Sequence, residues 1–369
     1  LFGYNILFLF LTISLLKWAL VFGTSKHLLL TGVHPFRRML DLPGPRGWMA
    51  LMFLLIILVA QPVWVSFHSS VLGNYFALLT GTTESLNGAA QFLWALLMIG
   101  GVLCLSLFGG YNVMEKVQIG VVAGLMLAAV ASMLMYDPNY LEMLKGFFTP
   151  LFRDYPEWIE QKEQFKEIAD KNKWVELTTY VGVIGGAGFD YMAYTTWLRD
   201  KRWGYAGSAP PSAELIEELA NDPQHAARKW LKAPVIDCAV SFSLIIIFSA
   251  VFVTSGVEML GPKEAIPDSR DMLGQQAEIL TNVHPWLYPL YVAGAVLTMF
   301  GTLYGTFEIG VAIVMEIMRS FNAKWANARR PKIERNVLVW QAGFAVVVVL
   351  MMFQVVYGAG IEEGDKAKA

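Results

Sequence analysis

The chain has 369 residues, of which 56% are hydrophobic, 13% aromatic and only 16% charged, and its formal net charge at pH 7 is -2. With a mean hydropathy of +0.48, this composition argues against an ordinary soluble domain and is typical of a polytopic membrane protein. The small net charge does not favour a nucleic-acid partner, and Cys104 and Cys238, both in apolar runs, supply neither a disulfide framework nor a metal cluster.

Eight stretches are long and apolar enough to cross a bilayer. The hydrocarbon core is about 30 Å thick, which needs about 20 apolar residues of helix. The stretches are too continuously apolar to be barrel strands, which alternate at every second residue. They run over 3–23, 48–72, 89–108, 116–136, 176–198, 234–257, 286–318 and 337–357. We therefore expect residues 1–369 to form a single all-α transmembrane transporter domain.

Basic residues predict the orientation, because loops rich in lysine and arginine face the cytoplasm. The first stretch then runs from outside to inside. Since the chain begins at Leu1 inside an apolar run, we expect a fragment that is incomplete at both ends. An external loop over 137–174 and a cytoplasmic loop over 199–233 are each expected to contain a short helix. The cytoplasmic set comprises Lys26, Arg37, Arg38, Arg46, Lys116, Arg199, Lys201, Arg202, Arg228, Lys229, Lys232, Arg319, Lys324, Arg329, Arg330, Lys332 and Arg335.

The stretch GVIGGAGFDYMAYTTWL, residues 182–198, places four glycines around one aspartate, Asp190. A charge at the bilayer centre costs about 2.5–3.5 kcal/mol on insertion scales, so it needs a reason. Glycines permit backbone conformations that a helix interior refuses. A broken helix leaves carbonyl groups without partners, and membranes tolerate this only where the carbonyls line a cavity or bind a solute. The glycines are Gly182, Gly185, Gly186 and Gly188.

This pattern predicts an interrupted helix that binds a cation. Asp190 is the expected anionic ligand, backbone carbonyls near Gly186 and Gly188 are expected to assist it, and Tyr191 and Met192 are expected to line the site. The alternative is that the glycines only allow close helix packing, with Asp190 hydrogen-bonded to a neighbour.

Four other polar residues lie within apolar stretches. His68, after Pro62, is either part of a proton pathway or a structural hydrogen-bond donor. Glu308 lies deep in its stretch and is a candidate for proton movement or gating. Glu316, near the cytoplasmic end, is expected to form an exposed i,i+3 pair with Arg319. Lys17 is expected to extend its side chain toward the cytoplasmic surface.

No enzyme motif competes with these features. The chain has no GxxxxGK loop, no HExxH motif and no paired cysteines. A membrane hydrolase would need a nucleophile with a base in reach, and His68 among many serines is too generic to indicate one. The sequence therefore predicts a protein that is not an enzyme and has no permanently bound cofactor.

Several segments together resemble the Nramp family of divalent metal transporters. The family's second helix resembles GYNILFLFLTISLLKWALVFGTSKHLLLTG, and its fifth resembles GGYNVMEKVQIGVVAGLMLAAVASML, followed by the turn GFFTP. The sixth resembles IGGAGFDYMAYTTWLRDKR, and the end of the eighth resembles AIVMEIM. The resemblance implies the second to ninth of about eleven helices, in a leucine-transporter-type fold with inverted repeats and broken helices.

The sequence also departs from the family pattern. Where the family's sixth helix carries a Met-Pro-His run, this chain reads Gly188-Phe189-Asp190-Tyr191, with Met192 following. A carboxylate without an aligned thioether favours a harder ion, such as Mg²⁺, and a divergent branch of the family. The family's acidic proton residue in the third helix falls at His68, so that proton coupling is altered or absent. The family's first helix, with its Asp-Pro-Gly-Asn motif, is not in this sequence.

The resemblance implies secondary-active transport of a divalent metal cation, either Mn²⁺- or Fe²⁺-like or harder, with proton coupling left open. The metal ion would be the substrate and the lipid bilayer the environment, in a bacterial inner (plasma) membrane. The oligomeric state stays open. Two alternatives remain: an organic-solute carrier of amino-acid type with the same fold, and a membrane scaffold that transports nothing.

Overall fold

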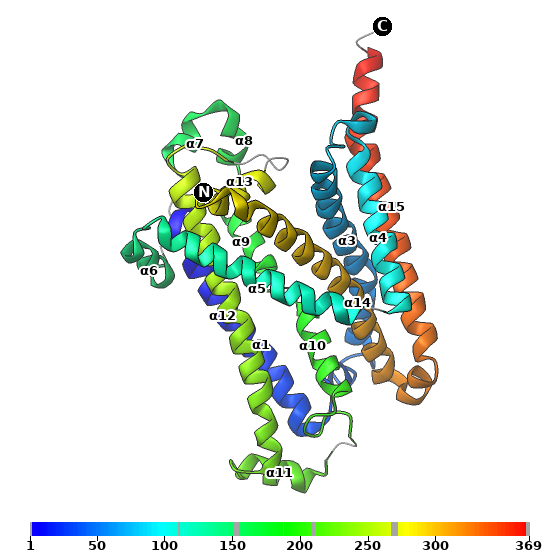
Figure 1. Cartoon of the computed structure of the whole chain (residues 1–369). Coiled ribbons are helices and arrows are strands. Elements are labelled where there is room, and N and C mark those ends of the chain that lie inside the picture. The colour runs from blue at the N-terminus through cyan, green and yellow to red at the C-terminus, as the bar shows by residue number, and fades with distance from the viewer. Residues whose placement is uncertain are drawn as a thin grey trace. The chain divides into compact units, whose positions relative to one another are not determined.

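The computed structural model describes residues 2–109, 111–150, 155–186, 188–208, 211–266 and 272–366. Within these ranges all regular secondary structure is helical, and no strand occurs (Figure 1). The prediction of an all-α protein is therefore confirmed.

Seven helices in the described part of the chain are long and apolar enough to cross a membrane. The remaining predicted stretch, 176–198, is divided between α9 (Lys173–Val183) and α10 (Gly188–Asp200). The protein is thus a polytopic membrane protein with an interrupted helix. The seven spans are Gly3–Thr31, Trp48–Leu79, Ala90–Phe108, Glu115–Met135, Ala226–Leu260, Pro285–Ala328 and Arg330–Val356.

The chain forms two compact units, and the first comprises Leu1–Val33 and Ala123–Tyr291. In this unit α1 (Ile6–Thr31) packs along α12 (Lys232–Ser255), and α10 packs against α1 (Figure 1). A buried apolar cluster of Val21, Tyr191, Cys238 and Phe242 joins these three helices. The other elements are η1 (Gly3–Asn5), part of α5 (Tyr111–Met135), α6 (Tyr140–Phe148), α7 (Glu157–Gln161), η3 (Glu163–Phe165), α8 (Lys166–Ala169), α9, α11 (Ala213–Asn221), η4 (Ala226–Leu231), η5 (Gly256–Leu260), α13 (Met272–Thr281) and η6 (Pro285–Leu287).

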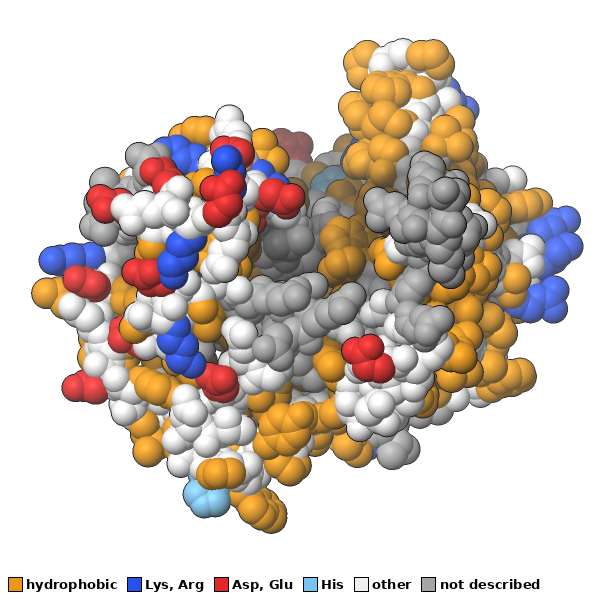
Figure 2. Space-filling view, turned by 90° about the horizontal axis from the view of Figure 1, so that it is seen from above, with side chains coloured by type: hydrophobic (Ala, Val, Ile, Leu, Met, Phe, Trp, Pro, Cys, Tyr) orange, Lys and Arg blue, Asp and Glu red, His pale blue; other side chains and the backbone are white. Residues whose placement is uncertain are grey.

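Short helices form in the described parts of the two long connecting segments of this unit. In the described part of 137–174, where one short helix was expected, the chain forms α6, α7, η3 and α8. Figure 2, seen from above, shows acidic and basic side chains intermixed on the surface where these short helices lie. In the segment 199–233, Ser212 Oγ accepts a hydrogen bond from the Leu215 amide at 3.3 Å and so caps α11. Arg228 Nε donates to the Leu219 carbonyl at 3.0 Å, near the other end of α11.

The second unit comprises His34–Val122 and Val292–Ala369. One boundary between the units follows α1, and the other two fall inside α5 and α14 (Tyr288–Ala328). Its helices α3 (Trp48–Leu79), α4 (Ala90–Phe108) and α15 (Arg330–Lys366) form a bundle (Figure 1). Gly73 lets α3 approach α4 closely, because a Cβ there would lie 2.8 Å from the Ala95 amide nitrogen. The unit also holds α2 (Pro35–Met39) and η2 (Ser85–Gly88).

Pro62 lies inside α3, and the helix continues across it. Proline has no N–H, so the carbonyl four residues earlier, that of Leu58, lacks its helical donor. Trp340 of α15 supplies the replacement, because its indole Nε1 donates to the Leu58 carbonyl at 2.9 Å. The proline thus becomes a point at which two helices of the bundle are joined.

Candidate functional site

The glycine-rich stretch interrupts the helix as predicted. Helix α9 ends at Val183, and the next residue, Ile184, is extended with a ψ of 115°. Gly185 and Gly186 follow with φ of +70° and +89°, a region that favours glycine. Gly188 begins α10, and Ala187 lies outside the described residues. A Cβ at Gly182 or Gly188 would meet nothing within 4 Å, so close helix packing does not explain these two glycines.

The interruption turns backbone carbonyls out of the helical ladder, and two side chains bind them. The Tyr191 hydroxyl donates to the Gly185 carbonyl and, at 3.4 Å, to the Gly186 carbonyl. Lys17 Nζ donates to the Ile184 carbonyl at 2.5 Å and to the Gly186 carbonyl at 2.6 Å. Three consecutive carbonyl groups therefore face polar hydrogen atoms here instead of helical amides.

The position of Lys17 corrects the sequence prediction. We expected its side chain to extend to the cytoplasmic surface, but it lies in the middle of α1 and binds carbonyls 167 and 169 residues further along the chain. The physical reason is that α1 packs against α10, so acceptors at the interruption are within reach. These carbonyls accept hydrogen bonds from the ammonium group inside the unit, so the lysine side chain does not extend to the surface for water.

Asp190 lies in the first turn of α10, where the positive end of the helix dipole stabilises a carboxylate. A Cβ at Gly186 would collide with the Asp190 carboxylate, so only glycine allows the aspartate to lie over the interruption. The charges of Asp190 and Lys17 interact with each other. The site therefore combines one carboxylate, one ammonium group and the carbonyl groups of three consecutive residues.

Of the other predicted site residues, Tyr191, Gly188 and Met192, only Tyr191 has a described polar contact at the interruption. Tyr191 is buried, with its ring in the apolar cluster and its hydroxyl at the interruption. Gly188 is already helical, so its carbonyl points along α10. Met192 follows in the same helix, and its carbonyl accepts hydrogen bonds from the hydroxyls of Thr195 and Thr196, at 2.7 and 3.2 Å.

His68 belongs to the second unit and is hydrogen-bonded to Thr306 of α14. Its Nδ1 lies 3.2 Å from Thr306 Oγ1. The Thr306 Oγ1 also lies 2.8 Å from the Thr302 carbonyl, to which the hydroxyl can donate its single hydrogen. With the hydroxyl in that orientation, neutral His68 carries its proton on Nδ1 and has its lone pair on Nε2. The ring also stacks on Trp64, with the centroids 5.7 Å apart.

Glu308 lies on α14 two residues after Thr306, about 200° further around the helix. Its carboxyl lies near the hydroxyls of Ser106 and Tyr304, and its charge interacts with that of Glu334. Thr306, the partner of His68, and Glu308 therefore point to different faces of α14, and the structure does not bring His68 and Glu308 together.

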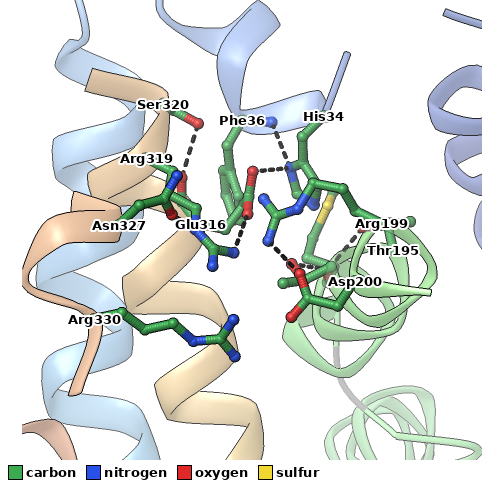
Figure 3. A network of polar contacts seen from close by, with 12 residues as sticks. His34, Phe36, Thr195, Arg199, Asp200, Glu316, Arg319, Ser320, Asn327 and Arg330 are labelled. Carbon is green, nitrogen blue, oxygen red and sulfur yellow. Dashed lines mark hydrogen bonds and ion pairs between the residues drawn. The ribbon is translucent and has the colours of Figure 1, made fainter. Parts of the chain in front are cut away.

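Glu316 forms the predicted pair with Arg319, but the pair is buried (Figure 3). Arg319 Nη1 lies 3.6 Å from Glu316 Oε2, and the side chains are only 11% and 4% exposed. The expectation of an exposed pair was wrong because His34 and Phe36, distant in sequence, pack in this region. His34 Nδ1 lies 3.9 Å from Glu316 Oε1 and accepts the Phe36 amide at 3.3 Å, which caps α2. No local signal at Glu316 indicates this histidine.

Among the described residues, no group of three or more His, Cys, Asp or Glu side chains is placed to hold a metal ion.

The comparison with curated individual proteins finds no match. A family model described as "Natural resistance-associated macrophage protein-like", Nramp, matches residues 2–358, which is nearly the whole chain. The chain therefore belongs to the Nramp family, whose members carry divalent metal ions across membranes.

Proposed function

We propose that this protein transports a divalent cation through a site at the interruption between α9 and α10, with Asp190 as the anionic ligand. The observation that supports the proposal most strongly is the set of carbonyls from Ile184 to Gly186, which lie outside the helical ladder beside Asp190. Carbonyl and carboxylate oxygens are the ligands that hard divalent cations prefer. Helix rocking about this site would expose it alternately to the two sides of the membrane.

The donor set favours Mg²⁺ and Mn²⁺ over softer ions. The groups described at the interruption that could bind an ion are oxygens, namely the carbonyls of Ile184, Gly185 and Gly186 and the carboxylate of Asp190. A soft ion would gain from a thioether, and Met192 is one helical step beyond Tyr191. An organic solute with a carboxylate would be repelled by Asp190, which counts against the amino-acid-type carrier.

Proton coupling, where it occurs, is proposed to involve His68 and not Glu308. His68 Nδ1 is engaged with Thr306, and an imidazole with its proton on Nδ1 can take up a second proton on Nε2. A His68→Gln variant would then uncouple metal uptake from an inward proton gradient, whereas Glu308→Gln would leave the coupling unchanged. Equal coupling in His68→Gln and in the unmodified protein would contradict this assignment.

The test is uptake of Mn²⁺ and Mg²⁺ by the full-length protein in proteoliposomes, with and without an inward proton gradient. Asp190→Ala and the isosteric Asp190→Asn should both lower uptake by roughly tenfold or more, because each removes the charged ligand. The matched control is Glu142→Gln, which neutralises an exposed acid of the same unit and should leave uptake unchanged. Uptake of neither ion, or uptake indifferent to Asp190, would contradict the proposal and favour the organic-solute carrier.

A further inference from the structure

The ammonium group of Lys17 occupies two of the carbonyl oxygens that a transported cation would use. Its Nζ donates to the carbonyls of Ile184 and Gly186, which flank the residue bound by Tyr191. We propose that Lys17 is a tethered cation of the transport site, and that a divalent ion binds by displacing it. This inference rests on the proposed function, because it concerns the same site.

Simultaneous binding of the lysine and a metal ion is disfavoured by charge. A Mg²⁺ or Mn²⁺ ion coordinated by the Gly186 carbonyl would lie only a few ångströms from the Lys17 nitrogen, which is 2.6 Å from the same oxygen. Two positive charges at this separation repel strongly in a partly buried site. The carbonyls therefore hold either the ammonium group or the metal ion.

The lysine side chain can exchange with a metal ion without a change in the fold. Its four-carbon stem is flexible, so the ammonium group can leave the carbonyls without unfolding α1. In the metal-free state it satisfies carbonyls that would otherwise lack donors in an apolar region. The Asp190 carboxylate is then balanced by Lys17, and after the exchange it is balanced by the metal.

Displacement also predicts selectivity by charge. A monovalent ion would replace one positive charge by another and lose the hydrogen bonds of the ammonium group. A divalent ion brings a second positive charge to Asp190 and the carbonyls, so its attraction to the site is about twice as large. Lys17 is thus proposed to be a specificity-determining residue that rejects Na⁺ and K⁺.

The simpler explanation is that Lys17 only caps the end of α9, where a basic group near the last carbonyls is favourable. The two explanations differ in their effect on affinity. A structural cap supports the site, so its removal should weaken metal binding or leave it unchanged. A competing cation should strengthen metal binding when it is removed.

The experiment measures Mn²⁺ binding to the purified full-length protein by electron paramagnetic resonance. Lys17→Met removes the charge and the donor, and Lys17→Gln keeps a neutral donor in case the methionine variant does not fold. Lys26→Met removes an exposed lysine of the same helix and is the matched control. Circular dichroism checks the folding of each variant.

We expect Lys17→Met and Lys17→Gln to bind Mn²⁺ roughly tenfold or more tightly than the unmodified protein. We also expect Na⁺ or K⁺ to compete with Mn²⁺ for the site in the two Lys17 variants but not in the unmodified protein. Adding Asp190→Asn to either variant should abolish its gain in Mn²⁺ affinity. Lys26→Met should bind like the unmodified protein.

Two outcomes would overturn the inference and differ in what they say of the proposed function. If the unmodified protein takes up Mn²⁺ or Mg²⁺ but folded Lys17 variants bind Mn²⁺ with equal or lower affinity, Lys17 is only a cap and the transport site stands. If no variant binds or transports either ion, the metal site itself is refuted, and the role of Lys17 is refuted with it.

Discussion

Replacing Trp340 by phenylalanine should destabilise the bundle of α3, α4 and α15 through one carbonyl group. The Trp340 indole donates at 2.9 Å to Leu58, whose helical donor is missing because of Pro62. Because the hydrocarbon core and its detergent equivalent hold no water to replace the donor, leaving this acceptor unpaired costs about 1–3 kcal/mol of unfolding free energy. Trp340 is 47% exposed, so the smaller ring should cost little packing and most of the loss should come from the N–H group.

The mechanism is tested by a double-mutant cycle with Pro62→Ala. An alanine at this position restores an amide that can donate to the Leu58 carbonyl, so Trp340→Phe should then cost less, by about 1 kcal/mol or more. The assay is denaturant unfolding in detergent micelles, followed by circular dichroism, for the unmodified protein, both single variants and the double variant. An equal cost of Trp340→Phe in both backgrounds, within about 0.5 kcal/mol, would refute the reasoning.

Three further predictions concern packing, a hydrogen bond and pH. Gly73→Ala should destabilise the protein by about 1–3 kcal/mol, because the new Cβ would meet the backbone of α4. Gly100→Ala, in α4 with nothing within 4 Å, should cost nothing in the same unfolding assay, and equal losses would contradict the close approach. Thr306→Val should cost about 1–3 kcal/mol, because it removes the hydrogen-bond partner of His68 Nδ1, whereas Thr306→Ser should retain stability; a loss in both would point to packing instead. In α11, hydrogen bonds from the Glu214 amide and the Ser212 hydroxyl hold the pKa of the Glu214 carboxyl below its ordinary value. The ionised group therefore stabilises the first turn above its unfolded-state pKa, and this contribution is lost as the pH falls through the folded pKa. Hydrogen-exchange protection of α11 should decrease over that range, and Glu214→Gln should remove the dependence; an unchanged pH profile in the variant would exclude this carboxyl as the cause.

The interruption of the helix could be predicted from the sequence because its cause is local. Two adjacent glycines, Gly185 and Gly186, adopt positive φ, and an acid follows within one helical turn. The transmembrane helices were predictable for the same reason, since length and hydropathy are properties of a single stretch. The end of α3 was harder to predict. The helix continues to Leu79, past the expected end at residue 72, through a polar run. Serines in that run donate to carbonyls of their own helix, as Ser70 does to Ser66 at 2.7 Å.

The partners of the buried polar groups could not be predicted, because they are distant in the chain. Lys17 finds its acceptors 167 residues away, and Leu58 finds its donor 282 residues away. His34 approaches Glu316 through packing that no single segment encodes. A sequence pattern indicates that such a group needs a partner, but only the assembled helices decide which one.

The distance in sequence between Lys17 and its carbonyls has a consequence for biosynthesis. Helix α1 is made before α9 and α10, so its lysine must enter the bilayer with no interruption to bind. At about 5–20 residues per second, the ribosome needs roughly 8–33 s to add the 167 residues up to Ile184. During this time α1 carries an insertion penalty of about 2.5–3.5 kcal/mol for a central lysine, which its apolar neighbours must offset. The nascent helix is therefore expected to remain beside the translocon, or to associate with lipid headgroups, until the chain has delivered the carbonyls that receive its charge.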